Sequence, residues 1–413
     1  MNLTITPTLL KGTITPPPSK SQAHRLIISA ALASGISTIQ NISLSQDIEA
    51  TIRCMKALGA SIEYSNNQSL QIRGIGGTVC LQGAESPPQF NCGESGSTLR
   101  FLIPIALAVA GGGVFTGKGR LMERPQQPYF DLFDRTNIFY EQKDGQLTVR
   151  GKLIPSDYLL PGNVSSQFFT GLLYALPLLD GDSTIVSTTA LESAGYIDMT
   201  LDALQTFGVS AVQKRSVFTI PGNQQFHSCT AAAEADWSQA AFWYAARALG
   251  STLEIHGLNP HSAQGDSIIR NHFLQLTQNK NATIDLAQCP DLAPPLAAMA
   301  AARSGTTILA NAGRLRIKES DRLTAIAAAL TALGAKVTEE SDQLVIEGCE
   351  YLRGGVTIDC CNDHRIAMMA AIAAIRCREP ITLLGAECVQ KSYPHFWEDY
   401  QQLGGIIHEH TGQ

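Results

Sequence analysis

Apolar stretches of two kinds alternate along this chain. Six times an alanine-rich apolar stretch, long enough for a helix, runs into a short segment of β-branched residues, which favour strands. Each apolar stretch opens on short polar or acidic residues. The six openings are Ser19-Lys20-Ser21, Ser95-Gly96-Ser97, Ser165-Ser166-Gln167, Asp236-Trp237-Ser238, Asp291 and Asn362-Asp363-His364-Arg365. The strands that follow are expected to begin near Thr38, Val114, Thr184, Thr252, Thr307 and Ile381.

Each opening is typical of a helix N-cap, because a short side-chain oxygen can accept from the first unpaired backbone N–H groups. The start of a helix also carries about half a positive charge from its aligned peptide dipoles. Four basic residues, Lys20, Arg25, Arg100 and Arg365, lie at these same openings. A fold that directs several such helix starts at one cleft would bind anions there.

A repeated unit explains the spacing of these elements. In residues 57–74, 205–222 and 332–348 a helix ends near a glycine, and a strand, a polar turn and a second strand follow. The remaining openings introduce weaker copies. Six units of roughly 70 residues would account for the whole chain. Parallel pairing through helical crossovers then predicts an α/β fold with buried helices.

The length of 413 residues exceeds what one hydrophobic core usually serves, so we expect two domains of three units each. The stiff run Pro16-Pro17-Pro18 suits a crossover between domains, and a second break lies in residues 223–230. We predict one domain over residues 19–225 and the other from residues 1–18 plus 226–413. The cleft between the domains is the expected site.

Composition and charge exclude several kinds of partner. The net charge is −6 with no block of like charges, which argues against nucleic acid or an anionic membrane surface as a partner. The longest apolar run, residues 101–110, is too short to span a bilayer. Residues 1–18 lack the basic patch and apolar core of a signal peptide. Any anion site must therefore be a local positive cluster on an acidic protein.

The cysteine pattern predicts a reduced, cytoplasmic protein. No C-x-x-C pair occurs, and the usual use of such cysteines is as small hydrophobic residues. Ligand spacing for zinc is absent, so a zinc site is not expected. The ten cysteines are Cys54, Cys80, Cys92, Cys229, Cys289, Cys349, Cys360, Cys361, Cys377 and Cys388.

Two openings in the N-terminal half favour an anion ligand most clearly. Lys20 falls in the first turn of its helix, where it opposes the helix dipole unless an anion is bound. Gly96 lets a ligand approach the backbone, and Arg100, one turn later, can hold a carboxylate or phosphate with two parallel hydrogen bonds. A capped helix start with a solvated cation is the plainer alternative at both places.

Residues 314–322 hold four cations and two carboxylates. Lys318 and Arg322 would share one face of the helix that this segment opens, although a solvated, salt-bridged turn has the same composition. Ordinary capping is the alternative for Ser165-Ser166-Gln167 and for the segment 362–365.

In these residues the chain resembles the 5-enolpyruvylshikimate-3-phosphate (EPSP) synthase family, the 3-phosphoshikimate 1-carboxyvinyltransferases, over nearly its full length. The matching motifs occur in the family's order. They are Pro18-Ser19-Lys20-Ser21 with Arg25, Gly96 with Arg100, Glu123-Arg124-Pro125, Ser165-Ser166-Gln167, Ser193 with Tyr196, Asp291, Lys318-Glu319-Ser320-Asp321-Arg322, Asn362-Asp363-His364-Arg365 and Lys391.

The resemblance implies a two-domain, inside-out α/β barrel of six βαβαββ units, three per domain, with the active site in the cleft. It also implies two small-molecule substrates, no cofactor and a monomer. The residues implied for shikimate 3-phosphate are Lys20, Ser21, Arg25, Ser165, Ser166, Gln167, Ser193, Tyr196, Asp291 and Lys318. Those implied for phosphoenolpyruvate are Lys20, Gly96, Arg100, Arg124, Gln167, Arg322, Arg365 and Lys391.

The family chemistry is addition followed by elimination in the shikimate pathway. The 5-hydroxyl of shikimate 3-phosphate attacks C2 of protonated phosphoenolpyruvate, and phosphate leaves the tetrahedral intermediate. Asp291 is implied as the base for the hydroxyl, and Glu319 with Lys318 as proton donor and acceptor at the methylene; Lys20 completes the catalytic set. A carboxyl among cations stays ionised, so Glu319 would need partial desolvation to hold a proton near neutral pH.

Four positions depart from the family's usual residues. Glu94 stands where a small amide residue is common, Ser97 replaces threonine, Phe101 replaces proline and Arg314 stands where asparagine often lies. These changes bear on affinity for phosphoenolpyruvate and for the herbicide that mimics it, in a direction that the sequence does not give.

Two rival functions share the expected scaffold. One is the sister enzyme that transfers enolpyruvyl to UDP-N-acetylglucosamine, whose loop with a catalytic cysteine has no counterpart in residues 118–124. The other is a non-catalytic anion-binding protein, which would need no acid or base. The presence of Asp291, Lys318 and Glu319 argues against such a protein.

Overall fold

Helices that are apolar on every side form the interior of this structure, a computed structural model that describes residues 1–65, 68–76 and 87–410. Every residue of α9 (Ala293–Ala301) and of α11 (His364–Ala374) is buried. In α5 (Ser166–Ala175) nine of ten residues are buried. A helix without a polar face must be enclosed by other elements, so the apolar stretches of the sequence become cores rather than surfaces.

The chain divides into two compact units, which are described separately. Unit 1 comprises Met1–Pro17 and Ala235–Gln413, and unit 2 comprises Pro18–Glu234. The sequence had suggested a break at residue 225. The structure assigns residues 226–234 to unit 2, because β14 (Thr230–Ala232) pairs in parallel with β3 (Ile36–Gln40) of that unit.

Unit 2 contains alternating helices and strands. Its helices are α1 (Lys20–Leu32), α2 (Gln46–Ala57), α3 (Gly96–Ala110), η1 (Leu121–Glu123), α4 (Gln127–Thr136), α5, η2 (Leu176–Leu178) and α6 (Ala194–Thr206). Its further strands are β4 (Ser61–Ser65), β5 (Ser69–Arg73), β6 (Gln89–Asn91), β7 (Gly112–Thr116), β8 (Phe139–Lys143), β9 (Gln146–Arg150), β10 (Asp157–Leu160), β11 (Ser183–Ser187), β12 (Val212–Lys214) and β13 (Val217–Ile220).

Unit 1 follows the same alternation. Its helices are α7 (Trp237–Ala248), η3 (Gly265–Ile268), α8 (Ile269–Gln278), η4 (Pro290–Leu292), α9, η5 (Gly313–Ile317), α10 (Arg322–Ala332), α11, η6 (Ala386–Lys391) and α12 (Phe396–Gln402). Its strands are β1 (Asn2–Thr6), β2 (Lys11–Ile14), β15 (Thr252–Ile255), β16 (Ala282–Asp285), β17 (Gly305–Ala310), β18 (Lys336–Glu339), β19 (Leu344–Gly348), β20 (Thr357–Asp359), β21 (Ile381–Leu384) and β22 (Ile406–His410).

The same small sheet recurs through the described residues. Five sheets each join one parallel pair of strands to two antiparallel pairs. Their strand orders are β14-β3-β5-β4, β6-β7-β9-β8, β10-β11-β13-β12, β16-β17-β19-β18 and β20-β21-β1-β22. The sixth copy is reduced to the parallel pair β15-β2. Each predicted strand start falls in one of these sheets, and the predicted hairpins are present as β4-β5, β12-β13 and β18-β19.

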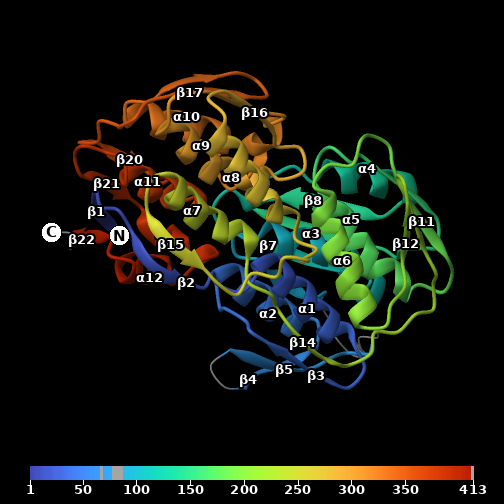
Figure 1. Cartoon of the computed structure of the whole chain (residues 1–413). Coiled ribbons are helices and arrows are strands. Elements are labelled where there is room, and N and C mark those ends of the chain that lie inside the picture. Colours follow the sequence, from blue (N-terminus) through green and yellow to red (C-terminus); the bar gives the residue numbers. More distant parts are fainter. Residues whose placement is uncertain (66–67, 77–86, 411–413) are drawn as a thin grey trace. The chain divides into compact units, whose positions relative to one another are not determined.

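In each unit the sheets surround neighbouring helices. In unit 1 the helices α7, α9 and α11 pack against one another, as Figure 1 shows, and sheets β16-β17-β19-β18 and β20-β21-β1-β22 contact them. In unit 2, α3 packs against α5, α5 against α6, and α1 against both α2 and α6. The helices are therefore inside and the strands outside, which leaves the helix starts as the places where buried polar groups gather.

A glycine and a proline allow the close approach of α3 and α5. Pro104, inside α3, has no N–H to donate to the carbonyl of Arg100, and the Tyr129 hydroxyl donates to that carbonyl instead, at 2.8 Å. A Cβ on Gly171 would collide with this hydroxyl and with the Arg100 carbonyl. The absence of a side chain at residue 171 therefore allows α3 and α5 to approach closely at this point.

Candidate active site

The expected N-caps are present in unit 2. The hydroxyls of Ser19, Ser95 and Ser165 accept from the backbone N–H of Gln22, Thr98 and Gln167 at 3.2–3.3 Å. Three helix starts thus carry both a satisfied cap and the positive end of a helix dipole.

Lys20 forms an ion pair that the sequence analysis missed. Its ammonium lies 2.7 Å from a carboxylate oxygen of Asp47, in the first turn of α2, and both side chains are largely buried. The ammonium of Lys20, whose charge opposes the dipole of α1, is therefore paired with the carboxylate of Asp47. The available signal was the Ser45-Gln46-Asp47 opening of α2, a second capped helix start with an acid in its first turn.

Arg25 holds three helices together through uncharged acceptors. Its guanidinium donates to the hydroxyls of Thr170 and Thr200 and to the carbonyls of Ser21 and Tyr196, at 2.7–3.4 Å. It also lies over the ring of Phe101. Burial without a carboxylate partner among the described residues lowers the pKa of Arg25 to about 10. The side chain thus brings Ser21 and Tyr196 to the same place and keeps a positive charge that no acid cancels.

Gly96 and Arg124 lie in direct contact. A Cβ built on Gly96 would lie 2.8 Å from the guanidinium carbon of Arg124, so only glycine lets this side chain rest on the start of α3. Arg124 follows η1 and is 7% exposed. The structure therefore brings together these two residues, which the sequence had separated by 28 positions.

Arg100 and Gln167 link the starts of α3 and α5. The Arg100 guanidinium donates to the Gln167 side-chain carbonyl and to the Pro125 carbonyl, both at 2.9 Å, and stacks over Phe168. The Gln167 amide donates to the Ser97 hydroxyl at 3.0 Å. With 2% of its surface exposed, Arg100 acts as a brace between the two helices in this structure.

The remaining candidates in unit 2 lie at the starts of α5 and α6. Ser166 is the first residue of α5 and is buried. Ser193 precedes α6 with a left-handed backbone, φ 57°, and its carbonyl accepts from the N–H of Tyr196. The positive φ turns the chain sharply into the helix and places residue 193 beside the turn that Arg25 holds.

In unit 1, Asp291 lies among three cations. One carboxylate oxygen faces Lys318 at 3.4 Å and Arg322 at 3.2 Å, and the other accepts from Arg365 at 3.0 Å. The expectation that Asp291 is a helix N-cap is wrong, because the residue lies within η4, whose N-cap is Cys289, and the N-cap of α9 is Leu292. Its oxygens bind side chains of unit 1 instead.

Arg322 is the centre of this ionic cluster. It forms a two-bond pair with Asp363 at 3.0 and 3.2 Å, and it also binds Glu319 at 2.6 Å as well as Asp291. Three carboxylates hold the pKa of Arg322 above its ordinary value, although burial opposes this shift. Asp363 is itself the N-cap of α11, so one acid both starts a buried helix and fixes the arginine.

Lys318 and Arg322 do not share a helix face as predicted. Lys318 ends η5, and α10 begins only at Arg322, with Asp321 as its cap. Both side chains nevertheless reach the same oxygen of Asp291. Burial lowers the pKa of the Lys318 ammonium, although Asp291 opposes this shift.

Arg365 and Lys391 complete this set. Arg365 donates to the Asp291 backbone carbonyl and to the Ser238 hydroxyl, both at 3.0 Å. Lys391, at the end of η6, donates to the Asn362 carbonyl at 2.5 Å. Unit 1 therefore gathers all of its candidates, Asp291, Lys318, Glu319, Arg322, Arg365 and Lys391, around the starts of α10 and α11.

Proteins with similar sequences identify the family of this chain. The family profile described as EPSP synthase (3-phosphoshikimate 1-carboxyvinyltransferase) matches residues 5–400. The chain belongs to the EPSP synthase family. A 3-phosphoshikimate 1-carboxyvinyltransferase of Clostridium kluyveri is 47% identical, and the alignment covers 98% of each chain. The corresponding protein of Clostridioides difficile is 46% identical over 99% of this chain and 98% of its own.

Solved structures show the same fold. EPSP synthase from Acinetobacter baumannii matches with a TM-score of 0.80 at 24% identity, covering 99% of this chain and 100% of that one. An enolpyruvyl transferase from Streptomyces tendae matches with a TM-score of 0.77 at 16% identity over 98% of both chains. The predicted family, its fold class and its enzyme class, a carboxyvinyl transferase, are confirmed.

The four residues that depart from the family's pattern have defined places. Ser97 accepts from Gln167, and Phe101 contacts His24 edge-on as well as Arg25. The Arg314 guanidinium donates to the Ala287 carbonyl at 2.6 Å. Glu94 lies against Gly119, where an added Cβ would meet its carboxylate.

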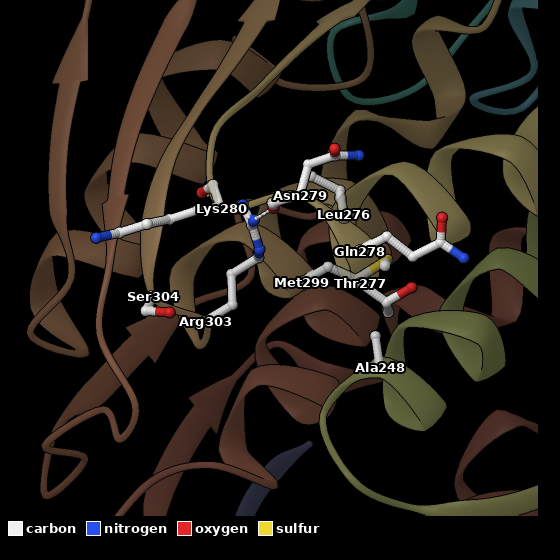
Figure 2. A pocket seen from close by; sticks show the side chains of 9 residues that line it. All are labelled: Ala248, Leu276, Thr277, Gln278, Asn279, Lys280, Met299, Arg303 and Ser304. Atoms are coloured by element: carbon white, nitrogen blue, oxygen red, sulfur yellow. Dashed lines mark hydrogen bonds between the residues drawn. The ribbon is translucent and has the colours of Figure 1, made fainter.

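Unit 1 also contains a pocket of about 480 Å³, whose lining residues are drawn in Figure 2. It is lined by the ends of α7, α8 and α9, and Arg303 there donates to the carbonyls of Asn279 and Lys280. None of the expected site residues lines it. Its lining includes the cations Lys280 and Arg303, but it lies at helix ends, which carry partial negative charge, and not at helix starts.

Two further observations concern the described residues. They contain no group of three or more histidine, cysteine or acidic residues placed to hold a metal ion. Among their helices, none combines the length and the apolar character that crossing a membrane requires. Cys80 lies outside the described residues, and of the other cysteines only Cys361 is exposed.

Proposed function

We propose that this chain transfers the enolpyruvyl group of phosphoenolpyruvate to the 5-hydroxyl of shikimate 3-phosphate, giving 5-enolpyruvylshikimate 3-phosphate and phosphate. Membership of the EPSP synthase family supports this assignment over the full length of the chain. The observation that carries it is the Asp291, Lys318, Glu319 and Arg322 cluster, because a protein that only binds anions has no need of partly exposed acids beside its cations.

Shikimate 3-phosphate is proposed to bind mainly residues of unit 2, together with two residues of unit 1. Arg25 keeps an uncompensated charge beside Ser21 and Tyr196, which suits a phosphate or carboxylate. Ser165, Ser166, Gln167 and Ser193 provide hydroxyl and amide groups at helix starts, where N–H groups also favour anions. Lys20, Asp291 and Lys318 complete the proposed set for this substrate.

Phosphoenolpyruvate is proposed to bind Lys20, Gly96, Arg124, Gln167, Arg322, Arg365 and Lys391. Arg100 also belongs to this set, and its contacts suggest that it acts by holding Gln167 and the segment before Gln126 in place. Fixed cations stabilise negative charge as it develops, without the cost of reorganising water.

The proton transfers follow from the charges of the cluster. Asp291, surrounded by cations, is proposed to take the proton of the 5-hydroxyl as that oxygen attacks C2. The lowered pKa of Lys318 suits a donor of the proton that the methylene carbon gains. Glu319, paired with Arg322, is favoured as a carboxylate and would take a proton back from the methyl group while phosphate leaves.

Released phosphate tests the proposal. With shikimate 3-phosphate and phosphoenolpyruvate together we expect turnover, and Asp291→Asn should abolish it. Thr277→Val is a suitable control, because that hydroxyl bonds only within α8. Turnover with UDP-N-acetylglucosamine instead would select the sister activity. Tight binding of both substrates without phosphate release would indicate a non-catalytic anion-binding protein.

The cellular setting is also a proposal. Reduced, mostly buried cysteines and the acidic composition support a cytoplasmic enzyme that binds neither nucleic acid nor a membrane. The family resemblance supports a monomer. Sedimentation at micromolar concentration would test the last point.

A further inference from the structure

A chain of hydrogen bonds crosses the interior of unit 2 from α1 to the start of α3. His24 Nδ1 lies 2.7 Å from the Thr51 hydroxyl, which lies 2.7 Å from the Thr98 hydroxyl, which lies 2.7 Å from the Ser95 hydroxyl. All four side chains are fully buried, on α1, α2, α3 and the cap of α3. None of them belongs to the proposed substrate-binding set.

We call this chain of four side chains the His24 relay. Which group donates in each of its hydrogen bonds follows from the last bond, between Thr98 and Ser95. Thr98 donates its hydroxyl proton to the Ser95 oxygen. A hydroxyl has one proton, so Thr98 must accept from Thr51. Thr51 has then used its own proton and must accept from His24. His24 is therefore the neutral tautomer with its proton on Nδ1, and its buried Nε2 is a bare nitrogen without a partner among the described residues.

The surroundings favour this neutral form. Burial lowers the pKa of His24 well below its ordinary value, and the nearby cations Lys20 and Arg25 lower it further. A neutral imidazole keeps one donor and one acceptor, whereas the charged ring would carry a second donor at Nε2. The ring packs edge-on against Phe101, where that second donor would find no acceptor.

Both ends of the relay meet residues of the proposed phosphoenolpyruvate site. Ser95 caps α3 through the Thr98 N–H, and the next residue is Gly96, on which Arg124 rests. One helical turn before His24 and Thr51, the same two helices are joined by the ion pair of Lys20 and Asp47. The relay thus ties the element that carries Lys20 to the element that carries Gly96.

We propose that His24 and Thr51 are positioning residues for phosphoenolpyruvate. Through the His24 relay, in which each group donates to the next, they fix the Ser95 cap. The cap in turn sets where Gly96 and Arg124 lie relative to Lys20. The proposal rests on the function proposed above and goes beyond its list of ligands. A general role in core stability is the competing explanation, because four buried polar groups also stabilise the fold when they are satisfied.

Three variants separate the two roles. Thr51→Val keeps the shape of the side chain and removes the hydroxyl, Thr51→Ser restores the hydroxyl, and His24→Asn keeps a donor near Nδ1 but loses ring packing. Thr136→Val makes the same isosteric change in unit 2 at a hydroxyl that bonds only the Leu132 carbonyl. KM for each substrate, kcat and the thermal midpoint are measured for all four.

Thr51→Val should raise KM for phosphoenolpyruvate about tenfold, the equivalent of one lost hydrogen bond, and leave KM for shikimate 3-phosphate within about twofold. Thr51→Ser should return both values to those of the unaltered protein. His24→Asn should raise KM for phosphoenolpyruvate in the same direction as Thr51→Val and should also lower the thermal midpoint through lost ring packing, whereas Thr136→Val should change neither KM. Equal rises in both KM values for Thr51→Val, or a fall in thermal midpoint alone, would overturn the proposal.

A second measurement does not depend on activity, so failure of the relay is distinguishable from failure of the proposed function. Nitrogen chemical shifts of ¹⁵N-labelled histidine report which ring nitrogen carries the proton. His24 should be the Nδ1–H form in the unaltered protein and should change in Thr51→Val. An Nε2–H form in the unaltered protein would contradict the relay even if the enzyme turns over as expected.

Discussion

Arg25 in unit 2 and Arg322 in unit 1 are buried to the same degree, with 2% and 1% of their surfaces exposed, yet their partners differ in kind. Arg25 donates to hydroxyls and carbonyls, and its pKa is lowered to about 10. Arg322 donates to three carboxylates, and its pKa is raised. The difference lies in the charge of the acceptors, since burial acts on both side chains in the same direction.

This contrast extends to the buried polar groups around each arginine. Apart from the Lys20–Asp47 ion pair, unit 2 connects its helices mainly through neutral acceptors, as in the His24 relay and the Arg100–Gln167 contact. Unit 1 connects its helix starts through ion pairs around Asp291 and Asp363. Uncompensated cations suit the binding of an anion, whereas a balanced cluster of acids and bases suits the transfer of protons. The two units therefore differ in chemistry although they repeat one fold.

The largest effect is expected at an acid of unit 1. Glu319→Gln should lower kcat by about 10²–10⁴-fold, the usual contribution of a general acid or base, with substrate affinity changed little. Pre-steady-state and equilibrium binding measurements separate these quantities. If kcat is unchanged, proton transfer does not involve Glu319, and the chemical contrast between the units loses its main support.

Loss of the central arginine should lower stability as well as affinity for phosphoenolpyruvate. Arg322→Met leaves the buried Asp363 with the Ser320 hydroxyl and the Arg365 N–H but without its arginine, and should lower the free energy of unfolding by about 3–5 kcal/mol. Denaturant unfolding followed by fluorescence would measure this loss. Adding Asp363→Leu should recover part of it, because no unpaired charge then remains at that position. A loss below 1 kcal/mol in the single variant would mean that the cluster is open to water.

Arg25→Met should lower the affinity for substrate and cost less stability than Arg322→Met. Thr170, Thr200 and the Tyr196 carbonyl already bond one another, so no buried charge is left unpaired and unfolding should cost less than for Arg322→Met. Affinity for shikimate 3-phosphate should fall by about 1.5–3 kcal/mol, or roughly 10–150-fold, the value of hydrogen bonds to a charged group. Calorimetric titration tests this. A larger stability loss than that of Arg322→Met would reverse the comparison.

The smallest effect concerns pH. The folded-state pKa of His24 is depressed, so below about pH 6.5 the unfolded chain binds a proton that the folded chain does not, and stability falls as pH falls. Between pH 7 and 6 this contributes about 0.7 kcal/mol of lost stability. The thermal midpoint of His24→Asn should therefore depend less on pH over this range than that of the unaltered protein. Equal dependence would show that His24 titrates normally.

Local pattern was sufficient to predict much of the fold. The capping serines at residues 19, 95 and 165, the strand starts and the three clearest hairpins depend on residues adjacent in sequence, so a single chain reveals them. The clustering of cations at helix starts also followed from sequence, because a lysine such as Lys20 in a first turn conflicts with the helix dipole. These features predicted an anion site before any contact was known.

Pairing between distant residues could not be read in this way. Asp47 was not among the expected site residues, but α2 brings it to Lys20. Asp291 was expected to be a cap, but its oxygens bind cations of unit 1. The amino-acid sequence by itself determined which charges the chain carries and which helix starts present them. Only the tertiary structure decided which charges are cancelled and which stay available, because that balance depends on distances and burial set by the packing of helices far apart in sequence.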